Sequence, residues 1–335
     1  MAETFQGVVT QIAGLASTVD CGDHGILTCD FRGRLFRKQN LRLAVGDRVS
    51  VLVEDDSVSL NKPELSQGEK ERRGVIEKVE NRRSSLHRTR ESKRDQVLCA
   101  NIDRVFVVNS VLEPGYKKGF IDRVLVAVER ESLEATLIFN KIDLLNDEEH
   151  FALLLEDLAI YQNLGYDMLF VSADSGHGLD DLTALLKDTV SVFTGPSGVG
   201  KSTLLNKLSP GLQLRTGEVG KSRKGRHVTS SAILLKLPHG GYVVDTPGVR
   251  AFGISGLKPE ELAPLFRDIR DIQSNCRFRN CRHCEEPGCA VLLAVDEGEL
   301  ALERYESYMR IYDDLATEAA RSPRKSRTLG RPGSS

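Results

Sequence analysis

The stretch Gly195-Pro196-Ser197-Gly198-Val199-Gly200-Lys201-Ser202 decides the fold of this chain. It matches the pattern GxxxxGK(S/T), and it lies between the apolar run Val190–Phe193 and the helical stretch Thr203–Leu208. A strand, a glycine-rich loop and a helix in this order predict a phosphate-binding loop, because glycines let backbone N–H groups turn toward phosphate oxygens. The amino end of the helix adds partial positive charge. We expect every residue from Gly195 through Thr203 to contact a nucleotide, with Lys201 on the β- and γ-phosphates and the Ser202 hydroxyl on Mg²⁺.

A second motif, Asn140-Lys141-Ile142-Asp143, precedes this loop in the chain and follows the apolar strand Ala135–Phe139. The Asp143 carboxylate can accept hydrogen bonds from N1–H and N2–H₂ of guanine, whereas adenine offers no such pair of donors. Lys141 is expected along the base plane. Ser172-Ala173, at the end of the next strand, can offer a backbone N–H to guanine O6. These residues predict a GTP-binding domain whose guanine motif comes before its phosphate loop, the reverse of the usual order.

The motif Asp245-Thr246-Pro247-Gly248 fits the switch pattern DxxG, and we name it the second switch segment. Asp245 is expected to hold Mg²⁺ through water, and the Gly248 N–H to sense the γ-phosphate. The basic, glycine-containing stretch Gly217–Ser231, named the first switch segment, is expected to order and disorder with nucleotide. Within it Thr229 is the predicted Mg²⁺ ligand, and Thr216, just outside it, is the alternative.

The residue after Gly248 bears on the expected rate of hydrolysis. Many GTPases carry a water-orienting glutamine there, but this chain has Val249. We therefore expect slow intrinsic hydrolysis and a need for an activating surface. His227 is the nearest residue that could position the attacking water as a catalytic group, and the alternative is an ordinary surface histidine.

A third site is predicted from the run Cys276-x4-Cys281-x-His283-x5-Cys289. Three thiolates and one imidazole satisfy tetrahedral Zn²⁺, and four protein ligands close the site, so a structural role is expected. Cys284 follows His283 directly and should point away if both of its neighbours bind. A redox-active cysteine pair is the alternative. The helix expected after the cluster has apolar residues at helical spacing, which predict its packed face: Leu302, Tyr305, Met309, Tyr312 and Leu315.

The pattern of expected strands, turns and helices along the sequence predicts a multidomain chain. Short alternating strands with glycine turns indicate a small β-barrel, most simply an OB-fold, and strands alternating with helices indicate an α/β sheet covered by helices. The expected parts are the barrel at 1–82, a basic linker at 83–100, the GTPase domain at 101–254, a helical zinc-binding domain at 255–320 and a basic disordered tail at 321–335.

Composition sets few global limits on the 335 residues. The formal net charge of −2 is unremarkable, although residues 70–94 carry many more Lys and Arg than acids. No apolar run is long enough to span a bilayer, and no leader pattern opens the chain. Crowded Cys and His favour metal over disulfides and hence a cytoplasmic protein. We expect a monomer that binds neither membrane nor DNA.

With these motifs assembled, the chain resembles the circularly permuted GTPases called ribosome small subunit-dependent GTPase A, from Gly7 to about Tyr312. The stretches Cys-Arg-Phe-Arg-Asn-Cys at 276–281 and Glu-Pro-Gly-Cys-Ala-Val at 286–291 also look like that family. The resemblance implies GTP hydrolysis stimulated by the 30S particle, late small-subunit maturation, and release of a maturation factor or of the GTPase itself. It also implies that the OB-fold contacts 16S ribosomal RNA.

This chain departs from the family's pattern at one switch residue. The family usually reads Arg-His-Thr-Thr where this chain has Arg226-His227-Val228-Thr229, which favours Thr229 as the ligand. Three other functions stay open: a GTP-dependent factor that binds a non-ribosomal RNA, a P-loop kinase or ATPase for a small molecule, and an adaptor that binds GTP without hydrolysis. The guanine motif opposes the second. Because the motifs are circularly permuted, the second switch segment is the last motif of the GTPase domain and leads directly into the expected zinc-binding domain.

Overall fold

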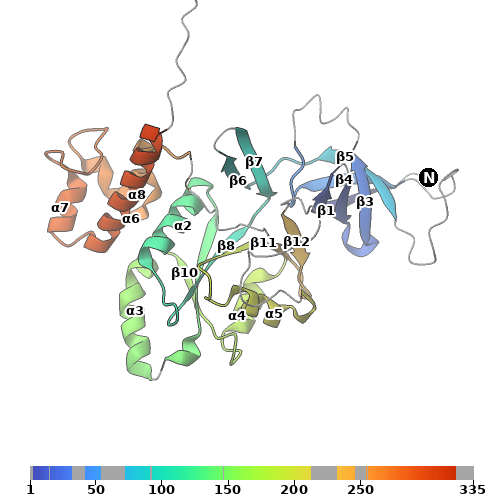
Figure 1. Cartoon of the computed structure of the whole chain (residues 1–335), viewed down its shortest axis with the longest axis horizontal. Coiled ribbons are helices and arrows are strands. Elements are labelled where there is room, and N and C mark those ends of the chain that lie inside the picture. Colours follow the sequence, from blue (N-terminus) through green and yellow to red (C-terminus); the bar gives the residue numbers. More distant parts are fainter. Residues whose placement is uncertain are drawn as a thin grey trace, which may run out of the picture. The chain divides into compact units, whose positions relative to one another are not determined.

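The computed structural model describes residues 3–14, 16–31, 42–53, 72–90, 93–145, 147–212, 232–245, 254 and 256–321, and for 87–90, 93–96 and 245 only the backbone. The chain forms two compact units, Met1–Gly253 and Ile254–Ser335. Figure 1 shows their helices and strands. None of the helices in the described part is both long and apolar enough to cross a bilayer.

The first five strands form a closed barrel in the order β1-β2-β3-β5-β4. Their bounds are β1 Glu3–Ala13, β2 Ala16–Asp20, β3 Ile26–Phe31, β4 Arg48–Val53 and β5 Arg73–Val79. β3 and β5 pair in parallel, and the other neighbours are antiparallel. Alternating apolar residues such as Val19, Val49 and Ile76 fill its core. The prediction of an N-terminal OB-fold barrel is confirmed.

The segment expected to be a basic linker contains two strands, β6 Ser85–Arg90 and β7 Lys93–Ala100. They pair with each other in an antiparallel two-stranded sheet, separate from both larger sheets. Leu86 lies opposite Cys99, and both side chains are buried. Charged residues make up much of both strands, so the sequence shows little alternation of apolar and polar residues. For this reason the segment was expected to lack strands.

A six-stranded sheet in the order β10-β9-β8-β11-β13-β12 forms the core of the predicted GTPase domain. Only β12 runs antiparallel to its neighbour. The strands are β8 Arg104–Ser110, β9 Glu134–Asn140, β10 Asp167–Phe170, β11 Val190–Thr194, β12 Ile233–Lys236 and β13 Tyr242–Asp245. Phe106, Ile138 and Phe193 belong to one buried cluster, as expected for parallel strands covered on both faces. The predicted α/β sheet is confirmed.

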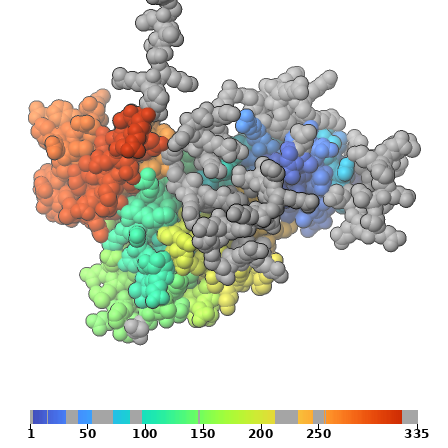
Figure 2. Space-filling view, in the orientation of Figure 1, coloured from blue at the N-terminus to red at the C-terminus, as the bar shows by residue number. Residues whose placement is uncertain are grey.

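Four helices connect these strands: α2 Lys118–Arg130, α3 Glu148–Asn163, α4 Leu179–Leu186 and α5 Lys201–Leu208. Side chains of α2 and α3, in green, form a continuous surface in the space-filling view of Figure 2. Asp147 caps α3, since its carboxylate accepts the His150 N–H at 2.9 Å. The strands β8, β9 and β11 all end at the same edge of the sheet, which is where α/β folds bind ligands.

The second unit is helical, with α6 Arg267–Ile272, α7 Ala290–Asp296 and α8 Leu302–Arg321. The predicted packed face of α8 is partly wrong, because Leu302 is 59% exposed while Arg304 is buried. The Arg304 guanidinium donates to Asp268 at 2.8 and 3.1 Å. The ion pair joins α8 to α6. The buried face of α8 therefore contains Arg304 together with Tyr308, Ile311 and Leu315. A buried arginine cannot be recognised from hydrophobic spacing.

Candidate functional site

The phosphate-binding loop joins β11 to α5, the strand and helix context that its motif requires. Gly200 precedes α5 with φ of 93°, a conformation that favours glycine. A Cβ on Gly195 would lie 2.1 Å from the Val108 carbonyl oxygen, and a Cβ on Gly200 would lie 2.3 Å from the Asn140 side-chain nitrogen. The loop therefore packs so tightly against the ends of β8 and β9 that these positions admit no side chain.

Asn140 holds three loops together at the end of β9. Its Nδ2 donates to the Val199 carbonyl at 2.8 Å, and its Oδ1 accepts the Ala173 N–H at 3.1 Å. The side chain is buried, so both hydrogen bonds are shielded from water. The guanine motif, the 172–173 loop and the phosphate loop are thus brought together, as expected of one nucleotide site.

The guanine-reading residues have different surroundings. Asp143 is exposed in a short 3-10 turn, Ile142–Leu144, and is open to a base. Ser172 is buried, and its hydroxyl accepts the N–H groups of Asp174 and Ser175, which shapes the loop. A backbone N–H of Ser172-Ala173 was expected to meet guanine O6. In this structure the Ala173 N–H donates to Asn140 and the Ser172 N–H to the His177 carbonyl.

Two lysines of the predicted site are held by backbone carbonyls. Lys201 Nζ donates to Gly195 at 2.8 Å and to Pro196 at 2.6 Å, so it lies along the inside of the phosphate loop. Lys141 has a left-handed backbone, with φ of 67°, and its Nζ donates to the Glu113 carbonyl. Sequence reasoning missed the loop around Glu113. The signal that could have indicated it is the Glu113-Pro114-Gly115 turn, which begins three residues after the end of β8.

The predicted Mg²⁺ ligands are only partly described. Ser202 is buried in the first turn of α5. The backbone of Asp245 ends β13, which pairs in parallel with β11 and so lies beside the strand that leads into the phosphate loop. The Asp245 side chain, Thr229, His227 and Gly248 lie outside the described residues.

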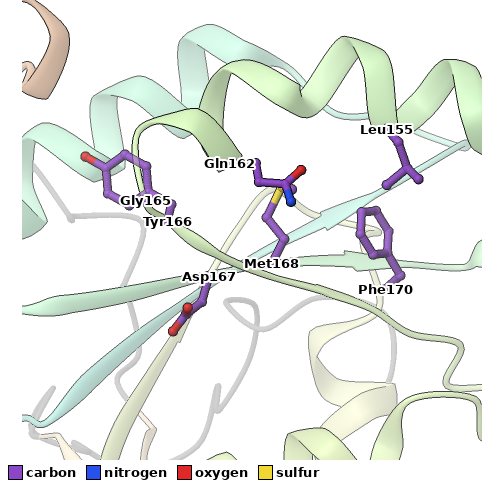
Figure 3. A pocket seen from close by; sticks show the side chains of 7 residues that line it. All are labelled: Leu155, Gln162, Gly165, Tyr166, Asp167, Met168 and Phe170. Atoms are coloured by element: carbon purple, nitrogen blue, oxygen red, sulfur yellow. The ribbon is translucent and has the colours of Figure 1, made fainter.

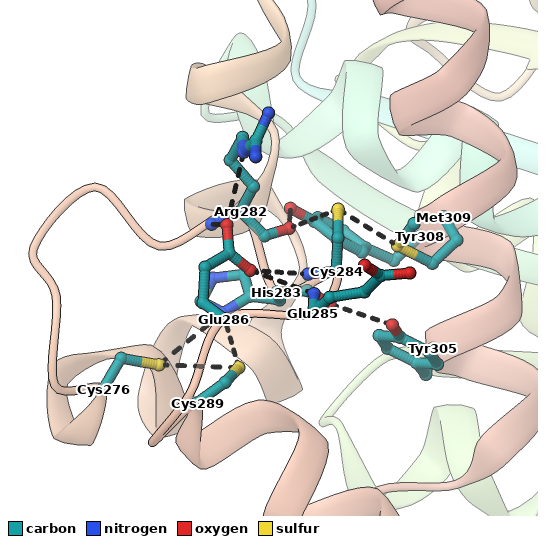
Figure 4. Close-up of polar contacts among 10 residues, drawn as sticks. All are labelled: Cys276, Arg282, His283, Cys284, Glu285, Glu286, Cys289, Tyr305, Tyr308 and Met309. Atoms are coloured by element: carbon teal, nitrogen blue, oxygen red, sulfur yellow. Dashed lines mark hydrogen bonds and ion pairs between the residues drawn. The ribbon is translucent and has the colours of Figure 1, made fainter.

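The Cys/His cluster of the second unit has the geometry of a metal site. The ligand atoms of Cys276, Cys281, His283 and Cys289 all lie within 4.8 Å of one another. Nδ1 of His283 is 3.6 Å from Cys276 Sγ and 3.4 Å from Cys289 Sγ, and those two sulfurs are 4.0 Å apart (Figure 4). Tetrahedral zinc with bonds of about 2.3 Å spaces two sulfurs by about 3.8 Å. The four residues could therefore hold a zinc ion.

Local backbone geometry brings these ligands together. His283 has a left-handed φ of 61°, which allows both it and Cys281, only two residues earlier, to face the same centre. The Ala290 N–H, at the start of α7, donates to Cys276 Sγ at 3.3 Å. On the other side, the Tyr305 hydroxyl donates to the His283 carbonyl at 2.8 Å and anchors the loop to α8 (Figure 4). Such outer contacts orient metal ligands.

Burial shifts the pKa values of a histidine and a cysteine in the cluster. Burial lowers the pKa of His283, which keeps its imidazole neutral and able to bind metal, while burial raises the pKa of the Cys281 thiol to about 12 in the absence of a cation. Cys284 is not part of the group, since its Sγ lies 3.5 Å from the Arg282 carbonyl and 4.0 Å from Met309 Sδ. It points away, as we expected.

Glu286 stabilises the turn of the same loop. Burial works to raise its pKa, but the N–H groups of Arg282 and Cys284 donate to the carboxylate and lower the pKa to about 2. The Arg282 side chain also pairs with it at 3.2 Å. The carboxylate therefore closes a turn over residues 282–286, which contains the predicted ligand His283.

A surface pocket at the far edge of the sheet is not part of the nucleotide site. It lies between α3 and β10 (Figure 3) and is lined by Leu155, Gln162, Gly165, Tyr166, Asp167, Met168 and Phe170. Gly165, Tyr166 and Asp167 precede or begin β10, at the opposite end of the strand from the ligand-binding edge.

Known proteins resemble the chain over most of its length. The family model described as RsgA GTPase matches residues 79–255. "Small ribosomal subunit biogenesis GTPase RsgA" of Chlorobaculum tepidum is 41% identical over 94% of this chain and 100% of its own. The protein of the same name from Shewanella oneidensis is 39% identical over 92% of this chain and 83% of its own.

Solved structures give the same result. The crystal structure of YjeQ from Thermotoga maritima superposes with a TM-score of 0.74 at 37% identity, covering 94% of this chain and 99% of that one. The structure of YloQ, described as a circularly permuted GTPase, gives 0.72 at 29% identity, with 94% and 96% covered. The family match, the identities and the shared fold agree with the rotated motifs and the Cys/His cluster, and the chain therefore belongs to the RsgA GTPase family.

Proposed function

We propose that this chain hydrolyses GTP while bound to the small ribosomal subunit during its late maturation. The nucleotide part of the proposal rests on two hydrogen bonds of Asn140 in the guanine motif. It donates to the Val199 carbonyl of the phosphate loop and accepts the Ala173 N–H of the 172–173 loop. The ribosomal part is supported by relatives whose name is "Small ribosomal subunit biogenesis GTPase RsgA". Hydrolysis would be stimulated by the particle and coupled to release of a maturation factor or of the chain itself.

The geometry of the phosphate-binding loop supports a set of proposed nucleotide contacts. Backbone N–H groups of residues 195–203 at the start of α5 would surround the phosphates, with Lys201 moving from its loop carbonyls onto phosphate oxygens. Asp143 and Lys141 would read guanine, with Ala173 close by. Ser202, Thr229 and Asp245 would hold Mg²⁺, which screens the phosphate charge when bound.

Water activation is assigned to the first switch segment. With Val249 after Gly248, no glutamine stands at the usual place to orient water, so His227 is proposed to do so once the particle orders the segment. His227→Ala should then lower particle-stimulated hydrolysis about 100-fold or more, the usual contribution of a positioned acid–base group, with little change in GTP affinity.

The other parts of the chain would supply binding and stability. The barrel is proposed to contact 16S ribosomal RNA, and one structural Zn²⁺ to hold the loop of Cys276, Cys281, His283 and Cys289. We propose domains at 1–82, 101–254 and 255–320, a connecting segment at 83–100 and a basic tail at 321–335. The chain would act as a cytoplasmic monomer without membrane or DNA partners.

The test is multiple-turnover GTP hydrolysis with and without purified small subunits, and with large subunits as a control. The proposal expects slow turnover alone, a rise of about tenfold or more with small subunits, and no rise with large ones. Equal rates under all conditions would overturn it. Crosslinking that recovers mainly non-ribosomal RNA would instead favour a GTP-dependent factor for another transcript.

A further inference from the structure

Asp20, the last residue of β2 in the barrel, makes a buried contact with the GTPase sheet. Its Oδ2 accepts the Tyr242 hydroxyl at 2.8 Å and lies 2.8 Å from Lys236 Nζ, while its Oδ1 accepts the Gly22 N–H at 2.9 Å. The Asp20 side chain is 3% exposed. Three donors therefore converge on one shielded carboxylate, an arrangement in which charge-assisted hydrogen bonds are strong.

The two partners of Asp20 on the sheet are themselves a cross-strand pair. Lys236 ends β12 and lies directly opposite Tyr242, which begins β13. The barrel strand β1 also packs beside β12 (Figure 1). Asp20 thus contacts both strands of the β12–β13 pair and links them to the barrel through one side chain.

The β12–β13 strand pair occupies a critical place in the chain. Apart from Ala232, it directly follows the first switch segment, and it ends on Asp245, the first residue of the second switch segment. Tyr242 is three residues before Asp245, a distance of about 10 Å along a strand. The Tyr242 N–H also donates to the Thr189 carbonyl at 2.7 Å, just before β11 leads to the phosphate loop.

We propose that Asp20 is a positioning residue for GTP hydrolysis. Through Lys236 and Tyr242 it fixes the strand pair on which both switch segments are anchored, and so conveys engagement of the barrel by the ribosomal particle to the nucleotide site. The inference rests on the proposed function, in which the particle stimulates hydrolysis. In this inference, stimulation of hydrolysis passes from the Asp20 carboxylate of the barrel through the β12–β13 strand pair to the switch segments.

The experiment compares Tyr242→Phe, Asp20→Asn and the double variant with the unchanged full-length chain. Tyr242→Phe removes one hydroxyl and keeps the ring, while Asp20→Asn keeps the shape and removes the charge. The matched control is Asp47→Asn. Asp47 is also a buried barrel carboxylate that accepts a loop N–H, from Ala44 at 2.8 Å, and pairs with Arg82 at 2.7 Å, but neither partner lies on β12 or β13.

Four quantities are measured for each protein: the hydrolysis rate alone, the rate with saturating small subunits, the affinity for those subunits, and the melting temperature. Each single variant is expected to lower the stimulated rate about tenfold, which corresponds to about 1.4 kcal/mol of barrier, while the rate alone and the subunit affinity stay within about twofold. The double variant should resemble the single ones, because both changes break the same link. Asp47→Asn should leave the stimulation intact even if it melts at a lower temperature.

Four results would count against the inference. Full stimulation of Tyr242→Phe and Asp20→Asn would overturn it alone and leave the proposed function standing. Parallel loss of the unstimulated rate and of melting temperature would show a merely structural role, as would an equal effect of Asp47→Asn. Absence of stimulation in the unchanged chain would overturn the proposed function and this route together.

Discussion

The side-chain nitrogen of Asn140 lies 2.8 Å from the carbonyl oxygen of Val199, although the two residues are 59 positions apart. Asn140 belongs to the guanine motif and Val199 to the phosphate loop that follows it in the chain. Circular permutation leaves this contact possible because both residues lie at the same edge of one sheet. The contact shows why the order of motifs can rotate without changing how a nucleotide is held.

Asn140→Ala should weaken GTP and GDP binding about 100-fold. The change removes two buried hydrogen bonds, to Val199 and from Ala173, each of which contributes about 1–1.5 kcal/mol. Titration with a fluorescent guanine nucleotide measures the effect. Asn163→Ala, at an exposed position at the end of α3, is the control and should bind normally. A loss below about threefold would show that the two hydrogen bonds do not organise the site.

Asp143→Asn should remove the preference for GTP over ATP. The amide offers only one acceptor atom toward a base edge that presents two donors, so discrimination built on paired donors is lost. Competition binding with both nucleotides measures the ratio of affinities. Asp180→Asn, an exposed aspartate on α4, should keep the original ratio. An unchanged ratio for Asp143→Asn would assign guanine recognition to another residue.

Cys276→Ser should release the zinc expected in the second unit, while Cys284→Ser should retain it. Cys276 Sγ lies within 4.0 Å of both Cys289 Sγ and His283 Nδ1, whereas Cys284 Sγ faces Met309 on α8. Elemental analysis of the purified proteins gives the metal content per chain. A chelator should destabilise the unchanged protein and the Cys284→Ser variant alike. Equal zinc loss in both variants would contradict the assignment of ligands.

The contact of Asp20 should make stability depend on acid pH. Burial works to raise the pKa of this carboxyl, but hydrogen bonds from Lys236 and Tyr242 outweigh it and lower the pKa below the ordinary 3.8. A lowered folded-state pKa gives stability that is fully present above the unfolded value and is lost as pH falls through the folded value. The stability difference between the unchanged chain and Asp20→Asn should therefore be constant near neutrality and shrink below about pH 3.8.

Denaturant unfolding of both proteins, from about pH 6 to about pH 3, measures that difference. A bound zinc ion would be lost from both proteins alike in acid, so the metal site should cancel in the comparison. A difference that grows as the pH falls would mean that the folded-state pKa of Asp20 is raised, and the contact would then be wrongly described.

Local patterns predicted most of the fold, because the strands of the parallel sheet are short apolar runs that alternate with helical stretches. The phosphate loop needs only a strand, its glycines and a helix, and all are contiguous around Gly195–Ser202. The Cys/His cluster could be predicted for the same reason, since its four residues lie close together in the sequence, between Cys276 and Cys289. The bystander role of Cys284 followed from its place directly after His283.

Contacts between residues far apart in the chain could not be predicted from the sequence. Nothing near Asp20 indicates Tyr242, which is 222 residues away, and no periodicity indicates that Arg304 is buried against Asp268. The β6–β7 hairpin was missed for a related reason. Its strands are stabilised by pairing with each other, so a charged, weakly alternating segment can still form strands.

We expect the barrel also to protect the sheet from self-association. β12 is the end strand of the six-stranded sheet, and an uncovered end strand offers free N–H and C=O groups to any other strand. β1 packs beside it, and Asp20 holds Lys236 at its end. A chain shortened to residues 101–335 would leave β12 uncovered. We expect it to aggregate through this strand even if its nucleotide-binding residues are all retained.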